Sequence, residues 1–138
     1  MKCGILGGAT YPDGLSVATV AYINENGEMG NPKRPFMHRT LEENQEKCAK
    51  GIASNLTGSV SSAAVQKAFE FAGMTAKGDM VETIKKWNPN DPRANSPATI
   101  ARKAAKGKKG KNTVATNPSQ VLIDTGTMIS SIDYEVET

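Results

Sequence analysis

The chain has 138 residues, of which 38% are hydrophobic, and it carries a net charge of +3. This length and composition suit one soluble domain with a single core, and no apolar run is long enough to cross a bilayer. Residues 1–8 are too short and too rich in glycine to form the apolar part of a secretion signal, so we expect the protein to stay in the cytosol where it is made.

Residues 1–6 predict a short strand, and the glycines and proline between residues 7 and 14 predict turns and loop. Ser16 is placed to cap a helix that ends near Gly27, although the β-branched residues between them also suit a strand. The two prolines in residues 31–35 predict an extended, stiff loop.

The next helix is predicted to begin with Thr40 as its N-cap, because Glu43 lies three residues later in a capping-box pattern. One stripe of this helix should face the core. Its members are Leu41, Cys48, Ile52 and Leu56.

A further helix should open at Ser61 or Ser62, with apolar residues at helical spacing. These residues are Val65, Ala68, Phe69 and Ala72. Gly73 and Gly78 predict a break or kink, followed by a third helix that ends at residues 88–92. The predicted inner face of that third helix consists of Met80 or Val81, Ile84 and Trp87.

Ser96 before Pro97 predicts a short helix over residues 97–104, whereas the composition of residues 105–120 favours a flexible loop. Residues 132–137 alternate apolar and acidic side chains, as a half-buried strand does, and could pair with residues 1–6. The sequence therefore predicts a single α+β domain over residues 1–138. It has a small antiparallel sheet packed with several helices and a long flexible basic loop near residues 105–120.

Positive charge is concentrated in residues 100–119, which hold six cations and no acidic residue: Arg102, Lys103, Lys106, Lys108, Lys109 and Lys111. Because this segment carries +6 and the chain +3, the remainder carries −3. A solvated loop is the usual interpretation of such a run. The alternative is that these six residues contact DNA or an acidic partner.

The tripeptide Asp124-Thr125-Gly126 follows an apolar run, as the catalytic loop of aspartic proteases does. Those enzymes place the loop near the start of an almost all-β chain, whereas only twelve residues follow Gly126 here and helices are predicted before it. We therefore interpret the tripeptide as a structural turn, in which Asp124 or Thr125 caps and Gly126 adopts backbone angles closed to other residues.

Other catalytic and metal-binding arrangements lack the residues they need. The chain has one histidine, His38, and two cysteines, Cys3 and Cys48, which are far apart in sequence and are interpreted as small buried hydrophobes. The sequence predicts no catalytic residue, no metal site and no cofactor.

Four segments resemble one known family, the tail-completion and minor virion proteins of long-tailed bacteriophages and prophages. They are AYINENG (residues 21–27), RPFMHRTLEEN (34–44), NSPATIARK (95–103) and LIDTGTMISSIDYEV (122–136), in the order that the family has them. The chain departs from the family pattern at Asn26, Met37 and His38, and in the lysine- and glycine-rich insertion after Lys103.

The resemblance implies a small α+β subunit without enzymatic activity that forms a ring at the neck between phage head and tail. Related proteins act as tail terminators or head-to-tail joining proteins, commonly as hexamers. Implied partners are other copies of the chain and other neck, tail-tube or connector proteins, with DNA passing through the lumen and no membrane. The implied location is the virion, after synthesis in the bacterial cytoplasm.

Ring closure needs contacts between different surfaces of neighbouring subunits. We expect Arg34, Pro35, Phe36 and Arg39 to lie at such a contact, with Phe36 as a core residue as the alternative. Three other functions remain as alternatives: a dodecameric head-tail adaptor under the portal, a small DNA-binding module that uses the basic residues, and a retroviral-type aspartic protease.

Overall fold

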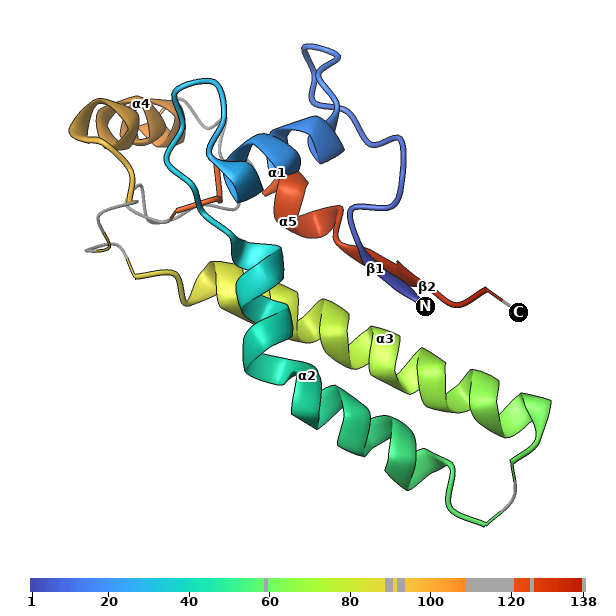
Figure 1. Cartoon of the computed structure of the whole chain (residues 1–138). Helices are drawn as coiled ribbons and strands as arrows, with labels where there is room; N and C mark the ends of the chain where they lie inside the picture. The colour runs from blue at the N-terminus through green and yellow to red at the C-terminus, as the bar shows by residue number, and fades with distance from the viewer. Residues whose placement is uncertain (59, 89–90, 92–93, 109–120, 125, 138) are drawn as a thin grey trace.

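The computed structural model describes residues 1–58, 60–88, 91, 94–108, 121–124 and 126–137. Over these residues the fold is α+β, as the sequence predicts, with five helices and a two-stranded antiparallel sheet (Figure 1). Two long helices, α2 and α3, form an antiparallel hairpin along one side of the molecule. The sheet, α1 and α5 lie on the other side of α3, and α4 lies beyond α1.

The sheet joins the two ends of the described chain. Strand β1 (Lys2–Gly4) pairs with β2 (Asp133–Glu135), with Cys3 opposite Tyr134. This confirms the predicted pairing. Lys77 of α3 lies 3.1 Å from the carboxylate of Asp133, and this contact ties the sheet to the helix beneath it.

Helix α1 (Val17–Asn26) confirms the helical interpretation of its ambiguous sequence. The Ser16 hydroxyl accepts a hydrogen bond from the Thr19 amide at 3.4 Å, and Gly27 ends the helix with a φ of 74°. Because only glycine reaches this left-handed conformation at little cost, Gly27 fixes where the chain turns away.

Helix α2 (Phe36–Asn55) begins five residues earlier than predicted, with Pro35 and not Thr40 at the N-cap position, so the assignment of Thr40 as N-cap is wrong. The carboxylate of Glu25, on α1, accepts hydrogen bonds from the Met37 and His38 amides at 2.9 Å each. A carboxylate from another helix thus satisfies the amides that a local cap would serve.

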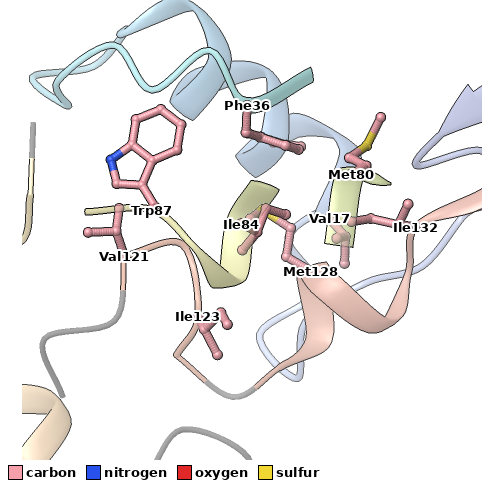
Figure 2. Packing of buried hydrophobic residues seen from close by; sticks show 10 residues of the cluster. Val17, Phe36, Met80, Ile84, Trp87, Val121, Ile123, Met128 and Ile132 are labelled. Carbon is pink, nitrogen blue, oxygen red and sulfur yellow. The ribbon is translucent and has the colours of Figure 1, made fainter. Parts of the chain in front are cut away.

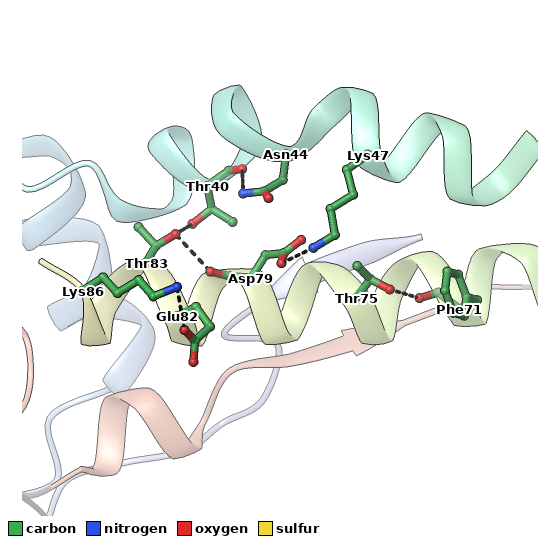
Figure 3. Close-up of polar contacts among 9 residues, drawn as sticks. All are labelled: Thr40, Asn44, Lys47, Phe71, Thr75, Asp79, Glu82, Thr83 and Lys86. Carbon is green, nitrogen blue, oxygen red and sulfur yellow. Dashed lines mark hydrogen bonds and ion pairs between the residues drawn. The ribbon is translucent and has the colours of Figure 1, made fainter.

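Thr40 has a different role inside the hairpin. Its side chain is buried, and its hydroxyl oxygen lies 2.7 Å from the Phe36 carbonyl oxygen and 2.8 Å from the Thr83 hydroxyl on α3 (Figure 3). Farther along, Lys47 and Asp79 form an ion pair of 2.6 Å between the same two helices. The predicted core stripe of α2 is also wrong, because Leu41 is 62% exposed and the other three members, Cys48, Ile52 and Leu56, are only partly buried and lie outside the core.

Helix α3 (Ser62–Lys85) runs without interruption, so the predicted break at Gly73 and Gly78 is wrong. Ser61 caps it, as expected, by accepting a hydrogen bond from the Ala64 amide at 3.1 Å. Gly73 is required by packing, because a Cβ there would lie 2.3 Å from Cδ2 of the Tyr134 ring. The missing side chain therefore lets strand β2 approach the helix.

Helix α4 (Pro97–Lys108) is capped by Ser96, whose hydroxyl accepts from the Thr99 amide at 3.3 Å. It extends beyond the predicted end at residue 104, so residues 105–108 are helical and not loop. The rest of the predicted flexible loop lies outside the described residues. Helix α5 (Thr127–Ser130) is a single turn before β2.

The core forms where α1, α3 and α5 meet the start of α2 and the segment 121–123 (Figure 2). As predicted, Met80, Ile84 and Trp87 point inward, although Met80 and Ile84 belong to α3 and Trp87 follows its end, so that no separate helix forms. Val17, Phe36 and Ile84 are fully buried. The distal half of the hairpin lies away from this core.

We predict that Gly73→Ala lowers the free energy of unfolding by about 2 kcal/mol, because the new methyl group collides with the Tyr134 ring. Gly78→Ala is the matched control, since a Cβ there meets no atom within 4 Å. It should raise stability by about 0.5 to 1 kcal/mol through helix propensity. Urea unfolding of dilute protein measures both, and equal effects would contradict the close approach.

We also predict that Glu25→Ala destabilises the protein by about 1 to 2 kcal/mol, because two amides at the start of α2 lose their acceptor. Glu28→Ala is the control. Glu28 is exposed, and its carboxylate forms no hydrogen bond or ion pair with any described residue, so its removal should change stability by less than about 0.5 kcal/mol. Thermal unfolding followed by circular dichroism compares the two variants.

Candidate functional site

A cleft of about 1010 Å³ lies between α1, the loop that precedes α2, the start of α4 and the segment that leads into α5. All four segments that carry the family resemblance contribute to its wall, through Asn24, Arg34, Asn95 and Asp124 among others. These residues are up to 100 positions apart in the sequence. The cleft is therefore where the recognisable parts of the chain come together.

Arg34 forms the centre of one wall. Its backbone amide donates to the Asn24 carbonyl at 2.7 Å, and its guanidinium donates to the Asn24 side-chain oxygen and to the Ala94 carbonyl, each at 3.2 Å. The residue is only 8% exposed. Burial lowers the pKa of Arg34, while the nearby charge of Asp91 acts in the opposite direction. Arg34 thus joins α1, the loop and the chain before α4.

Lys103 has the corresponding role on the other wall. It is 5% exposed, and its ammonium group donates to the Ile123 carbonyl at 2.5 Å. Lys103, in the third of the four segments that resemble the family (95–103), therefore holds the start of the fourth segment (122–136). The hydrogen bond explains how a cation is accommodated at this depth, since a buried charge needs a polar partner.

Acidic side chains balance these cations in the cleft. Asp13, Asp91 and Asp124 all line it, and burial together with the charges of Asp124 and Asp13 raises the pKa of Tyr11. Because residues of both charges line the cleft, it lacks the single-sign field that concentrates a charged ligand. The arrangement suits a joint between chain segments better than a binding pocket for an anion.

The segment around Asp124 differs from a protease loop. Residues 121–124 form turns and no strand, and they lead into the single-turn helix α5. Gly126 occupies the N-cap position with a φ of 83°, in the left-handed region expected for it. Asp124 therefore does not occupy that cap position, and Thr125 lies outside the described residues.

The structure separates the four candidate interface residues. Phe36 is fully buried and Arg34 nearly so, which places both inside the subunit and favours the core alternative for Phe36. Pro35 is half-buried. Only Arg39 is exposed, where its guanidinium lies 5.4 Å from the centre of the Trp87 ring and pairs with Glu43 at 2.8 Å.

The candidate DNA-binding residues are also separated. Arg102 is exposed, but Lys103 points inward and is unsuited to contact a partner. Lys106 and Lys108 belong to α4, and their side chains are not described. Lys109 and Lys111 lie outside the described residues. Among the side chains that the structure describes, Arg102 alone of this set is available at the surface.

Sequence reasoning missed a group of exposed apolar side chains. Tyr22 is 57% and Met29 83% exposed near α1, while Phe71 and Met74 on α3 are 45% and 56% exposed. The spacing of Phe71 and Met74, three residues apart and off the stripe of Val65, Ala68 and Ala72, was a signal that α3 has a second apolar face.

Within the described part of the chain, no helix is long and apolar enough to span a membrane. The same residues contain no group of three or more histidine, cysteine, aspartate or glutamate side chains that could hold a metal ion. Comparisons with known protein families, with curated proteins and with solved structures find no match for this chain.

We predict that Lys103→Ala lowers the free energy of unfolding by about 2 to 3 kcal/mol, because it empties a buried position and leaves the Ile123 carbonyl without this donor. Arg102→Ala, next to it but exposed, should change stability by less than about 0.5 kcal/mol. Urea unfolding tests the pair. Equal stability of both variants would mean that Lys103 is a surface residue.

Proposed function

We propose that this chain is a structural subunit of the neck between the head and tail of a long-tailed bacteriophage, where copies of it form a ring. In this proposal it acts as a tail-terminator or tail-completion protein and carries out no enzymatic reaction. Its partners are other copies of itself and the neighbouring neck or tail-tube proteins, with DNA passing through the lumen.

The observation that carries the proposal is that the four segments resembling the virion family are bonded in two pairs, the first with the second and the third with the fourth, and that all four line one cleft. Arg34 of the second segment holds Asn24 of the first, and Glu25 of the first caps the helix of the second. Lys103 of the third segment holds Ile123 of the fourth. Residues matched independently in sequence thus form the joints of one fold, which favours a real family relationship over chance similarity.

The roles of these residues also favour a structural protein. Three polar side chains form hydrogen bonds to the backbone of other segments and so hold helices and loops together. They are Arg34, Glu25 and Lys103. Asp124 lies in the wall of the same joint and leads into a helical turn. The polar chemistry of the matched segments thereby serves to build the subunit.

The test is to delete the gene from the phage or prophage that encodes it and to image the lysate by negative-stain electron microscopy. We expect filled heads and separate tails, or tails of irregular length, and restoration of complete particles by the wild-type gene. An Asp124→Asn variant should restore them too, because a turn residue needs no ionised carboxylate. Intact infectious particles in the deletion strain would contradict the proposal.

Immunogold labelling of complete particles supplies the position. Label at the neck supports a terminator or joining role. Label elsewhere on the particle would contradict the neck location but would still support the broader proposal that the chain is a virion protein. A ring count from purified particles separates a hexamer from a dodecameric adaptor.

A further inference from the structure

We propose that the outward face of helix α4 binds the phosphate backbone of duplex DNA without preference for sequence. The face is defined by four exposed positions of the helix, which are Ala98, Ala101, Arg102 and Ala105. The inference rests on the neck function proposed above and deepens it, because it names the part of the subunit that meets the DNA in the lumen of the ring.

Positive charge is separated from negative charge in this part of the sequence. Between Asp91 and Asp124 the chain has seven cations and no acidic residue. The seven are Arg93, Arg102, Lys103, Lys106, Lys108, Lys109 and Lys111. Because this stretch carries +7 and the whole chain +3, the remainder carries −4. Helix α4 therefore belongs to a stretch that attracts a polyanion, whereas the rest of the chain on balance repels one.

The structure divides α4 into an inward and an outward side. On the inward side Lys103 is buried and hydrogen-bonded within the subunit, and Ile100 and Ala104 are half-buried. Arg102 is exposed and forms no hydrogen bond or ion pair with any residue that the structure describes. Lys106 follows Arg102 by four positions, so the two are neighbours along the helix. The subunit thus uses the inward cation for its own fold and leaves the outward one for a partner.

The acidic residues of the neighbouring cleft are engaged inside the subunit. Arg102 also lines that cleft, together with Asp13, Asp91 and Asp124. The charge of Asp91 acts on the buried Arg34, and Oδ1 of Asp124 is itself buried. Asp13 accepts a hydrogen bond at 3.0 Å from the amide two residues after it. Since α4 itself contains no acidic residue, its outward face carries charge of one sign.

The side chains of the outward face favour a phosphate backbone over an acidic protein. Three of its four exposed positions are alanine, so the face lacks the large apolar and aromatic side chains that anchor protein interfaces. Small side chains also let a phosphate chain approach the helix closely. The planar guanidinium of Arg102 can donate to two phosphate oxygens at once. The face therefore offers charge and access, and little apolar area.

Duplex DNA is favoured over a single strand because this part of the chain has no ring on which bases could stack. No Phe, Tyr, Trp or His occurs between Trp87 and Tyr134. Proteins that hold single strands stack successive bases on aromatic side chains. Contacts with phosphates alone carry no sequence information. Helix α4 has 12 residues and is about 18 Å long, which spans about five phosphates of one strand.

Helix α4 lies at the edge of the molecule, on the side away from the sheet (Figure 1). None of the other helices and strands that the structure describes covers its outward face. A ring that turns this edge toward its axis presents α4 of every copy to the DNA. The weak contact of one copy is then repeated around the lumen, and the copies together bind more tightly than one alone.

Fluorescence anisotropy of a labelled DNA duplex tests the assignment with the purified chain. We expect a Kd of about 1 to 100 µM at low salt, equal for two duplexes of unrelated sequence, and weaker binding of a single strand of the same length. The affinity should fall steeply as salt is added, because bound phosphates release their counterions. Absence of duplex binding at the lowest salt, or tighter binding of the single strand, overturns the proposal.

Two pairs of matched variants locate the contact, all at exposed helical positions where the fold should be kept. Ala105→Glu adds an acid to the outward face and should weaken duplex binding about tenfold or more, whereas Ala63→Glu on α3 should change it less than about twofold. Arg102→Ala should weaken binding about threefold to tenfold and lower the salt slope by about one. Lys67→Ala removes the same charge from α3 and is its control. Equal losses within each pair would mean that the DNA responds only to net charge, and would remove the site.

Polyglutamate is the probe for an acidic protein as the partner. If it binds as tightly as the duplex at equal charge, and Ala105→Glu weakens both equally, the assignment to DNA is wrong. Deletion and labelling of phage particles test the neck function separately. A chain that joins heads to tails but binds no duplex keeps the neck function and loses the α4 site. A chain that binds duplex through α4 but is missing from the neck keeps the site and loses the neck function.

Discussion

The packing of the Tyr134 ring against Gly73 is the contact on which the rest of the structure depends. The Tyr134 ring occupies the space that a side chain at position 73 would need, and it brings strand β2 against the middle of α3, the longest helix. Because β2 pairs with β1, this contact also places the N-terminal strand. Helix α3 then has one side for the sheet, one for α2 and the core, and one that faces solvent.

A second constraint is that hydrogen bonds between separate chain segments take the place of hydrogen bonds between sequence neighbours. Glu25 caps α2 from α1, Arg34 reaches back to Asn24 and forward to Ala94, and Lys103 reaches Ile123. Each joins parts of the chain that are distant in sequence, and each uses a charged group in partly or fully buried surroundings. Such joints are sensitive to the loss of one partner, since the other is then left buried without its hydrogen bond.

These two constraints explain what the sequence could and could not predict. Helix starts at Ser16, Ser61 and Ser96 and the end at Gly27 were predictable, because cap and stop depend on neighbouring residues. The start of α2 was not, because Glu25 supplies its cap from another helix. Gly73 predicted a break by local propensity, whereas the ring that requires it is 61 positions away in the sequence.

The same reasoning applies to the candidate site. Arg34, Phe36 and Lys103 were identified by residue type and motif, and the structure places them inside the subunit, where a motif cannot distinguish a joint from an interface. The exposed residues of α3 lie between the second and third matched segments, in a part of the chain without resemblance to the family. The segments that resemble the family thus supply the buried joints of the subunit, whereas α3 and the second half of α2 lie outside them.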